Sequence, residues 1–138
     1  GDKYIESVKE GFLDAHPTNS IGKSLSPPMF DNILWESQQA ADGTWLVRFT
    51  GTVTKALNEK ALQKLVFMSN HPRYTAIANH IIHNTKIFVP GEKAELIFTF
   101  TGEGRFTITR QYVPSCYNAG VKKSFMDDLI TGIIFSPV

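Results

Sequence analysis

The chain has 138 residues, in which 14 Lys and Arg stand against 13 Asp and Glu, for a formal net charge of +1 at pH 7. This length accommodates one hydrophobic core that buries about two-thirds of the unfolded surface. Charges of both signs are interspersed and no apolar run approaches the ~18 residues that cross a bilayer, so we expect neither nucleic-acid binding nor a transmembrane segment.

The N-terminal region predicts two helices joined by a turn. Residues 4–15 place apolar side chains at helical spacing. The stretch NSIGKS, residues 19–24, contains the Gly-Lys-Ser that ends the phosphate-binding loop of nucleotide hydrolases. Such a loop must follow a strand, and it needs a glycine where this chain has Pro17. We therefore interpret Ser20 as the N-cap of a short helix that begins at Ile21, not as part of a nucleotide site.

Two hairpins are predicted from alternating apolar and polar residues. Residues 33–40 and 44–53 flank Asp42-Gly43, a pair that favours a tight hairpin turn. Residues 94–101 and 106–112 alternate in the same way on either side of a Gly-Glu-Gly turn. We expect four antiparallel strands that share an aromatic face.

Helical spacing fills the rest of the chain. Asn58 is the predicted cap of a helical insertion, residues 58–84, between the two hairpins. Residues 85–89 suggest a fifth strand or an extended edge, and a wide apolar stripe over residues 121–134 predicts a C-terminal helix that frays or ends near Gly132. We predict one α+β domain over residues 1–138, with an antiparallel sheet of four to five strands and helices on one face.

The cysteine and the histidines do not form a recognisable catalytic or metal-binding pattern. Cys116 lacks a local signature of a nucleophile and is predicted to lie in a loop. His80 and His83 are spaced three apart on a predicted helix and could gain a ligand from His71 or His16, but no cysteine, HExxH or Glu-x-x-His pattern completes the set. We expect no metal, no cofactor and no catalytic residue.

Arg110 is the most unusual residue of the predicted sheet. Strict alternation places it on the same face as Phe106, Ile108 and Tyr112. A charged group there must be paired, extend past the sheet margin to solvent, or line a pocket. The functional alternative is an anion-binding residue in a cleft between sheet and helices, with Arg48 and Tyr112 as neighbours.

A pattern of glycine, proline and apolar positions runs through VKEGFLDAHPTNSIGKSLSPPMFDNILWES and WLVRFTG, and more loosely through AELIFTF with GRFTI. In these stretches the chain resembles a family of uncharacterised bacterial exported proteins and lipoproteins. The matching positions are Val8, Gly11, Leu13, Pro17, Ile21, Gly22, Trp35, Phe49 and Gly51. The pattern is similar in shape to small outer-membrane assembly lipoproteins and β-lactamase-inhibitor-like domains. Ser20 replaces the family's usual Thr, Pro27-Pro28 breaks the second helix early, and the segment 58–84 is an insertion.

The sequence leaves two classes of function open. The resemblance implies a non-catalytic protein-binding module of the bacterial cell envelope, periplasmic or membrane-anchored after export by a signal that this chain does not contain; a cytoplasmic location stays open. The alternative is a small-ligand or enzymatic pocket domain, with Asp14, His16, Arg110 and Tyr112 as candidate polar groups and Arg48 beside them. A homodimer formed edge to edge through the threonine-rich strands is a further expectation.

Overall fold

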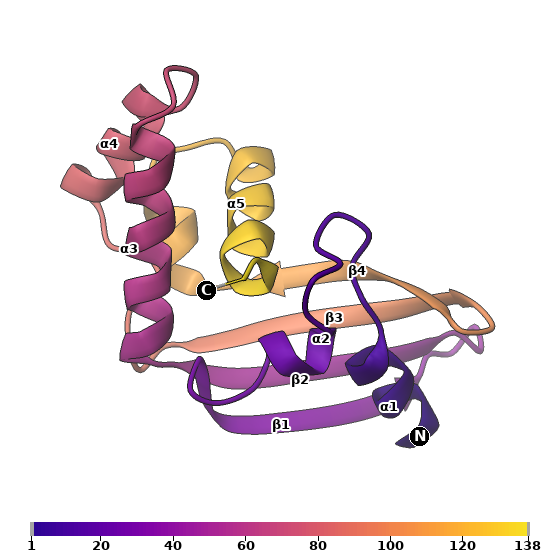
Figure 1. The fold of residues 1–138 in the computed structure, drawn as a ribbon. Coiled ribbons are helices and arrows are strands. Elements are labelled where there is room, and N and C mark those ends of the chain that lie inside the picture. The colour runs from indigo at the N-terminus through magenta and orange to yellow at the C-terminus, as the bar shows by residue number, and fades with distance from the viewer. Residues whose placement is uncertain (1, 138) are drawn as a thin grey trace.

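The computed structural model describes residues 2–137 as a four-stranded antiparallel sheet with helices packed on it (Figure 1). The α+β class predicted from the sequence is confirmed. The elements in chain order are α1 (Asp2–Glu10), α2 (Ile21–Ser24), β1 (Phe30–Gln39), β2 (Trp45–Val53), α3 (Lys55–Ser69), α4 (Thr75–Asn84), β3 (Lys93–Gly102), β4 (Arg105–Tyr112), the 3-10 helix η1 (Pro114–Asn118) and α5 (Lys123–Phe135).

The strands follow one another in the sheet in the order β1-β2-β3-β4, and all neighbours are antiparallel. Both predicted hairpins are present. In the first turn Gly43 adopts a φ of 88°, which glycine reaches without steric strain, and the Thr44 N–H donates to the Asp42 carboxylate at 2.9 Å. This order leaves β1 and β4 as the two edge strands, and α3 and α4 connect β2 to β3.

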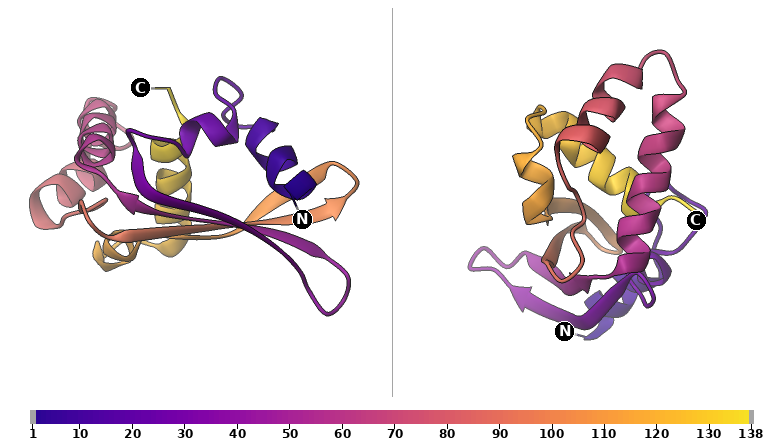
Figure 2. Two further views of the ribbon diagram at one scale, coloured as in Figure 1. Left: turned by 90° about the horizontal axis from the view of Figure 1, so that it is seen from below. Right: turned by 90° about the vertical axis from the view of Figure 1, so that its left-hand side faces the viewer.

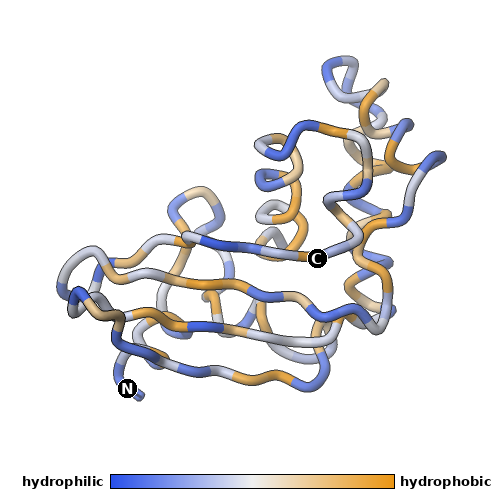
Figure 3. Tube along the Cα trace, turned by 180° about the vertical axis from the view of Figure 1, so that it is seen from behind, coloured by the Kyte–Doolittle hydropathy of each residue, from blue (hydrophilic) through white to orange (hydrophobic). Residues whose placement is uncertain are grey.

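The helices form a layer on one side of the sheet. Figure 2, left, shows the sheet edge-on with α1, α2 and α5 on the same side. Helices α3 and α4 pack against each other at one end of the sheet, and α3 also contacts α5. Figure 3 looks at the sheet from the opposite side, where hydrophilic and hydrophobic segments alternate along the strands. This alternation is expected of strands with one buried and one exposed face.

The core lies between the inner face of the sheet and the helices. The inward-facing Val47, Phe49, Leu96 and Phe98 of the central strands are fully buried. The ring of Trp35 meets that of Phe49 edge-on with centroids 5.1 Å apart, which extends the aromatic layer onto β1. The helices contribute Val8, Ile21, Leu57, Ala61, Leu65, Ile130, Ile133 and Ile134 to the same cluster.

The two N-terminal helices are present, but α1 is shorter than predicted and ends at Glu10. Phe12, which helical spacing had assigned to the apolar face of this helix, lies in the following loop and is 52% exposed. Helix α2 begins at Ile21 as predicted, because the Ser20 hydroxyl caps it by accepting from the Lys23 N–H at 3.2 Å. The Gly-Lys-Ser residues therefore belong to a capped helix that follows a loop.

The cap of α3 is Thr54, not Asn58 as predicted. The Thr54 hydroxyl accepts from the Leu57 N–H at 3.2 Å. The Asn58 side chain instead donates to the carbonyls of Ile87 and Phe88 at 3.3 and 3.1 Å. These two residues belong to the segment considered as a fifth strand, which forms no strand and is held by α3 with Phe88 fully buried.

The C-terminal helix is also confirmed, with shifted ends. It begins at Lys123, after η1, and runs past Gly132 to Phe135. Six of its apolar side chains are buried, so tertiary packing outweighs the ~1 kcal/mol penalty of a glycine in the helix. No helix within residues 2–137 is long and apolar enough to span a membrane.

Candidate functional site

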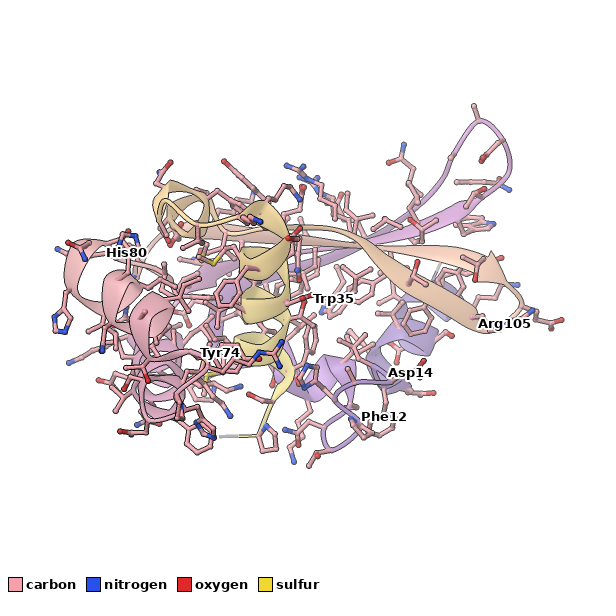
Figure 4. The ribbon with its side chains drawn as sticks, turned by 90° about the horizontal axis from the view of Figure 1, so that it is seen from above. Phe12, Asp14, Trp35, Tyr74, His80 and Arg105 are labelled. Atoms are coloured by element: carbon pink, nitrogen blue, oxygen red, sulfur yellow. The ribbon has the colours of Figure 1, made fainter. Side chains whose placement is uncertain are left out.

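A groove of about 1290 Å³ lies along edge strand β4. One wall is the loop after α1, residues 11–15. The other is the face of α5 that carries Lys123, Asp127 and Thr131. Figure 4 looks down on this region: Phe12 and Asp14 come from the loop, and Arg105 lies at the tip of the β3-β4 hairpin. The groove is thus a strand edge with a wall on its helical side.

Close packing of the loop on β4 requires Gly11. A Cβ atom built at this position would lie 2.8 Å from Cζ of Phe106 and 3.1 Å from the carbonyl oxygen of Ser7. Glycine therefore lets the chain leave α1 this close to β4 without displacing the Phe106 ring.

The ladder alternation determines which backbone groups face the free edge. At the β1-β2 turn the Ala40 N–H donates to the Thr44 carbonyl at 2.7 Å. Hydrogen-bonded and non-hydrogen-bonded pairs alternate along an antiparallel ladder. Phe49 is five residues from Thr44, so it turns its N–H and C=O away from β1 and toward its β3 partner, Leu96. Leu96 in turn directs its own backbone toward β2, so its partner on β4 must face away from the sheet.

That partner is Gln111, and its carbonyl does face outward, where it accepts from the Tyr117 hydroxyl at 3.1 Å. The same alternation along β3 makes Ile108 and Phe106 direct their N–H and C=O to the free edge. Apart from β3, no strand within residues 2–137 pairs with β4. The edge between Phe106 and Ile108 therefore presents unpaired backbone donors and acceptors.

A β-bulge at Thr109 corrects the predicted position of Arg110. Phe98 pairs with Ile108 and Ile97 pairs with Arg110, so Thr109 is the extra residue on β4. The bulge reverses the alternation, and Arg110 lies on the outer face instead of the inner face. The predicted grouping of Arg110 with Phe106 and Ile108 is wrong for this reason.

The bulge also turns Gln111 inward, where it joins β4 to α5. The Gln111 amide donates to the Asp127 carbonyl at 2.5 Å, and its side-chain oxygen accepts from the Thr131 hydroxyl at 2.9 Å. Tyr117 donates to the Asp127 carboxylate at 2.6 Å, and Lys123 bonds the same carboxylate at 2.8 Å. These contacts close one end of the groove.

The same contacts shift the pKa values of Asp127 and Tyr117 at this closed end. Partial burial opposes ionisation of Asp127, but the hydrogen bonds from Lys123 and Tyr117 outweigh it and lower the pKa of the carboxyl group. Burial, with the bond to Asp127, raises the pKa of Tyr117. The carboxylate and the neutral phenol are therefore both stable near pH 7, as a structural contact requires.

Arg110 shares a carboxylate with Arg48 on the outer face. Glu95 accepts from Arg110 Nε at 2.6 Å and from Arg48 Nη2 at 2.7 Å. The bond from Arg110, then that from Arg48, lowers the pKa of Glu95. The Arg110 guanidinium lies 5.1 Å from the ring centroid of Tyr112, which stacks on Tyr117 at 5.6 Å. Both arginines are thus held in place by a carboxylate of the protein's own sheet.

The structure brings some of the predicted polar groups together. Asp14, Arg110 and Tyr112 all line the groove. His16 does not line it; its N–H closes a turn with the Leu13 carbonyl at 3.0 Å. Arg48 lies on β2, two strands in from β4, and reaches the region only through Glu95 of β3. Sequence reasoning missed Phe12 and Ile108, because a residue's position at a sheet edge depends on strand order, which no local pattern encodes.

The cysteine and the helical histidines lie elsewhere. Cys116 is fully buried in η1, and burial raises the pKa of its thiol to about 12, so it stays protonated. His80 bonds the Ala119 carbonyl at 2.9 Å beside a second hollow of about 570 Å³ lined mostly by apolar side chains. Within residues 2–137 no three His, Cys, Asp or Glu side chains lie close enough together to hold a metal ion.

Compared with known protein families, with curated proteins and with solved structures, the chain shows no match to any of them.

Proposed function

We propose that the chain is a non-catalytic protein-binding module that takes up an extended segment of a partner protein along the edge of β4. The unpaired backbone of Phe106 and Ile108, facing the groove, carries the proposal. Strand addition to an exposed edge is a recurrent mode of peptide recognition, in which backbone hydrogen bonds give affinity and side-chain pockets give selectivity.

The shape of the hollow favours an extended ligand. The groove follows β4 from the hairpin tip at Gly104 and Arg105 to the closed end at Gln111 and Tyr117. A net hydrogen bond contributes about 0.5–1.5 kcal/mol, so the short free edge alone supports weak binding. The half-exposed Phe12 on the wall offers the apolar contact that a bound segment needs in addition. Placement in the bacterial cell envelope is supported by the family resemblance alone.

Two copies of the chain pairing through β4 are a poorer fit than a different partner. From Arg105 to Tyr112 the strand has two arginines and no acidic residue. A two-fold pairing would bring four arginines to one edge-to-edge junction without an opposing carboxylate from either strand. We therefore expect the partner to be another protein.

A peptide selection followed by an N-methyl scan tests the proposal. Random peptides displayed on phage are selected on the immobilised protein, and a selected peptide is synthesised with each backbone amide methylated in turn. In a strand only alternate amides face β4, so we expect binding to weaken about 2- to 10-fold at every second position and to change little between them. A selection without binders, or a scan without this two-residue period, contradicts strand addition.

A variant of the protein provides the matched control. Ile108→Pro removes an N–H that faces the free edge and keeps an apolar ring, whereas Ile108→Val keeps the N–H. We expect the proline variant to lose binding and the valine variant to keep it, with circular dichroism showing both folded. If the proline variant does not fold, the N-methyl scan on the unchanged protein still decides the question.

A further inference from the structure

We infer that the segment bound at β4 is an acidic amphipathic strand, with apolar side chains at alternate positions and Asp or Glu side chains between them. The inference rests on the proposed edge binding and adds the chemistry of the partner. It follows from the different character of the two sides of β4.

The inner side of the edge is apolar, and its walls carry two carboxylates and one lysine. Phe106 and Ile108 point to this side and are partly buried against the core, and Phe12 lines the same hollow from the loop with 52% of its surface exposed. Asp14 on the loop and the ion pair of Lys123 with Asp127 on α5 line the same hollow. Apolar side chains of an added strand find a surface here, whereas an acidic side chain finds no basic group among the described residues that is free of a carboxylate partner.

The outer side of the edge is basic. Arg105, Thr107 and Arg110 are exposed on this side, where the alternate side chains of an added strand would lie next to them. Arg110 Nε donates to Glu95, but 53% of the arginine side chain remains exposed. Arg105 has no ion-pair partner among the described residues. Opposite charges on neighbouring strands stabilise pairing, so carboxylates are the favoured partners at these positions.

A charge-exchange experiment tests this chemistry. The probes are the peptide Thr-Val-Glu-Val-Glu-Val-Thr-amide and the same peptide with Lys in place of both Glu. Both carry the same fluorophore at the N-terminus, and the readout is fluorescence polarisation at low salt. We expect the Glu peptide to bind more tightly, by about 1.5- to 5-fold for each charge pair formed. In Arg105→Glu we expect the difference to shrink or reverse in favour of the Lys peptide.

Lys93→Glu is the control with the same change in net charge. Lys93 is exposed on β3 and does not line the groove. We expect this variant to preserve the preference for the Glu peptide. An equal loss of preference in Lys93→Glu and Arg105→Glu would mean that the general field of the protein, not pairing across the edge, selects the peptide, and it would contradict the inference.

The outcomes separate this inference from the proposed function. Equal binding of both peptides, with the two-residue period retained in an N-methyl scan, keeps strand addition and contradicts the acidic pattern. Tighter binding of the Lys peptide contradicts it as well. If neither peptide binds and phage selection also yields no binder, the proposed function itself fails.

Discussion

Lys60 is a buried lysine held by one carbonyl group. It lies on α3 with 5% of its surface exposed, and its ammonium group donates to the Ile134 carbonyl near the C-terminal end of α5 at 3.0 Å. Burial, and then the nearby charge of Lys64, lowers the pKa of Lys60 to about 8. The contact joins α3 to α5, but the charged form is disfavoured relative to an exposed lysine.

The stability of the protein should therefore depend on the protonation of Lys60. An unfolded lysine has a pKa near 10.4, so between about pH 8 and pH 10 the unfolded chain binds more protons than the folded one, and the free energy of unfolding rises with pH. The full shift corresponds to about 3 kcal/mol. We expect urea denaturation from pH 7.5 to 9.5 to show this rise in the wild type but not in Lys60→Met.

Some other groups make the free energy of unfolding fall as the pH rises, and their contribution must be separated from that of Lys60. The pKa of Cys116 is raised in the folded protein, so its contribution is lost as pH rises past about 9. This contribution cancels in the difference between the wild type and Lys60→Met. Lys55→Met, at an exposed position of the same helix, should leave the pH dependence unchanged. A wild-type curve parallel to that of Lys60→Met would show that the lysine is not desolvated.

At the scale of single elements, β4 shows how far a local pattern can be followed. Its alternation identifies a strand and correctly assigns Phe106 and Ile108 to the inner face. It fails at Arg110, because one extra residue at Thr109 reverses the faces of all that follows. The sequence contains no glycine or proline there to announce the bulge. The register depends on which residues of the partner strand lie opposite, and the sequence of β4 alone does not specify them.

Deleting Thr109 should restore a regular strand. The deletion places Arg110 directly after Ile108, and the alternation then keeps Arg110 outside and Gln111 inside, as they are now. Deleting Thr107 instead makes Phe106 and Ile108 neighbours and forces one of them outward. We expect the Thr107 deletion to lower the free energy of unfolding by about 1–2 kcal/mol more than the Thr109 deletion, measured by urea denaturation.

The opposite order would contradict the assigned register. If the Thr109 deletion were the more damaging one, Thr109 would belong to the regular alternation and the bulge would lie elsewhere. The hydrogen bond between the hydroxyls of Thr109 and Thr99, at 2.7 Å on the exposed face, contributes little to this comparison.

Helix boundaries differ in how well they could be predicted, for a related reason. The Ser20 cap is predictable because its partner, the Lys23 N–H, is three residues away. The role of Asn58 is not predictable in this way, because the carbonyls it binds lie 29 and 30 residues along the chain. Interactions within one turn can be read from the sequence, and interactions that tertiary packing creates cannot.

At the scale of the whole molecule, hydrophobic periodicity was enough for the fold class. Two hairpins and amphipathic helices have few ways to bury their apolar faces other than as a sheet with a helical layer. The groove could not be predicted in the same way. It requires β4 to be an edge strand, the loop after α1 to approach Phe106, and α5 to pack beside Gln111, and each of these contacts joins distant parts of the chain.

Strand addition requires the edge of β4 to be free, and backbone amide exchange measured by NMR examines this edge residue by residue. Without a ligand the amides of Phe106 and Ile108 should exchange rapidly, while that of Arg110, which faces β3, should be protected. Addition of a phage-selected peptide should slow exchange at Phe106 and Ile108 and leave the edge of β1 unchanged. Slow exchange at these two amides in the free protein, or protection by the peptide at β1 instead, would contradict binding by strand addition at β4.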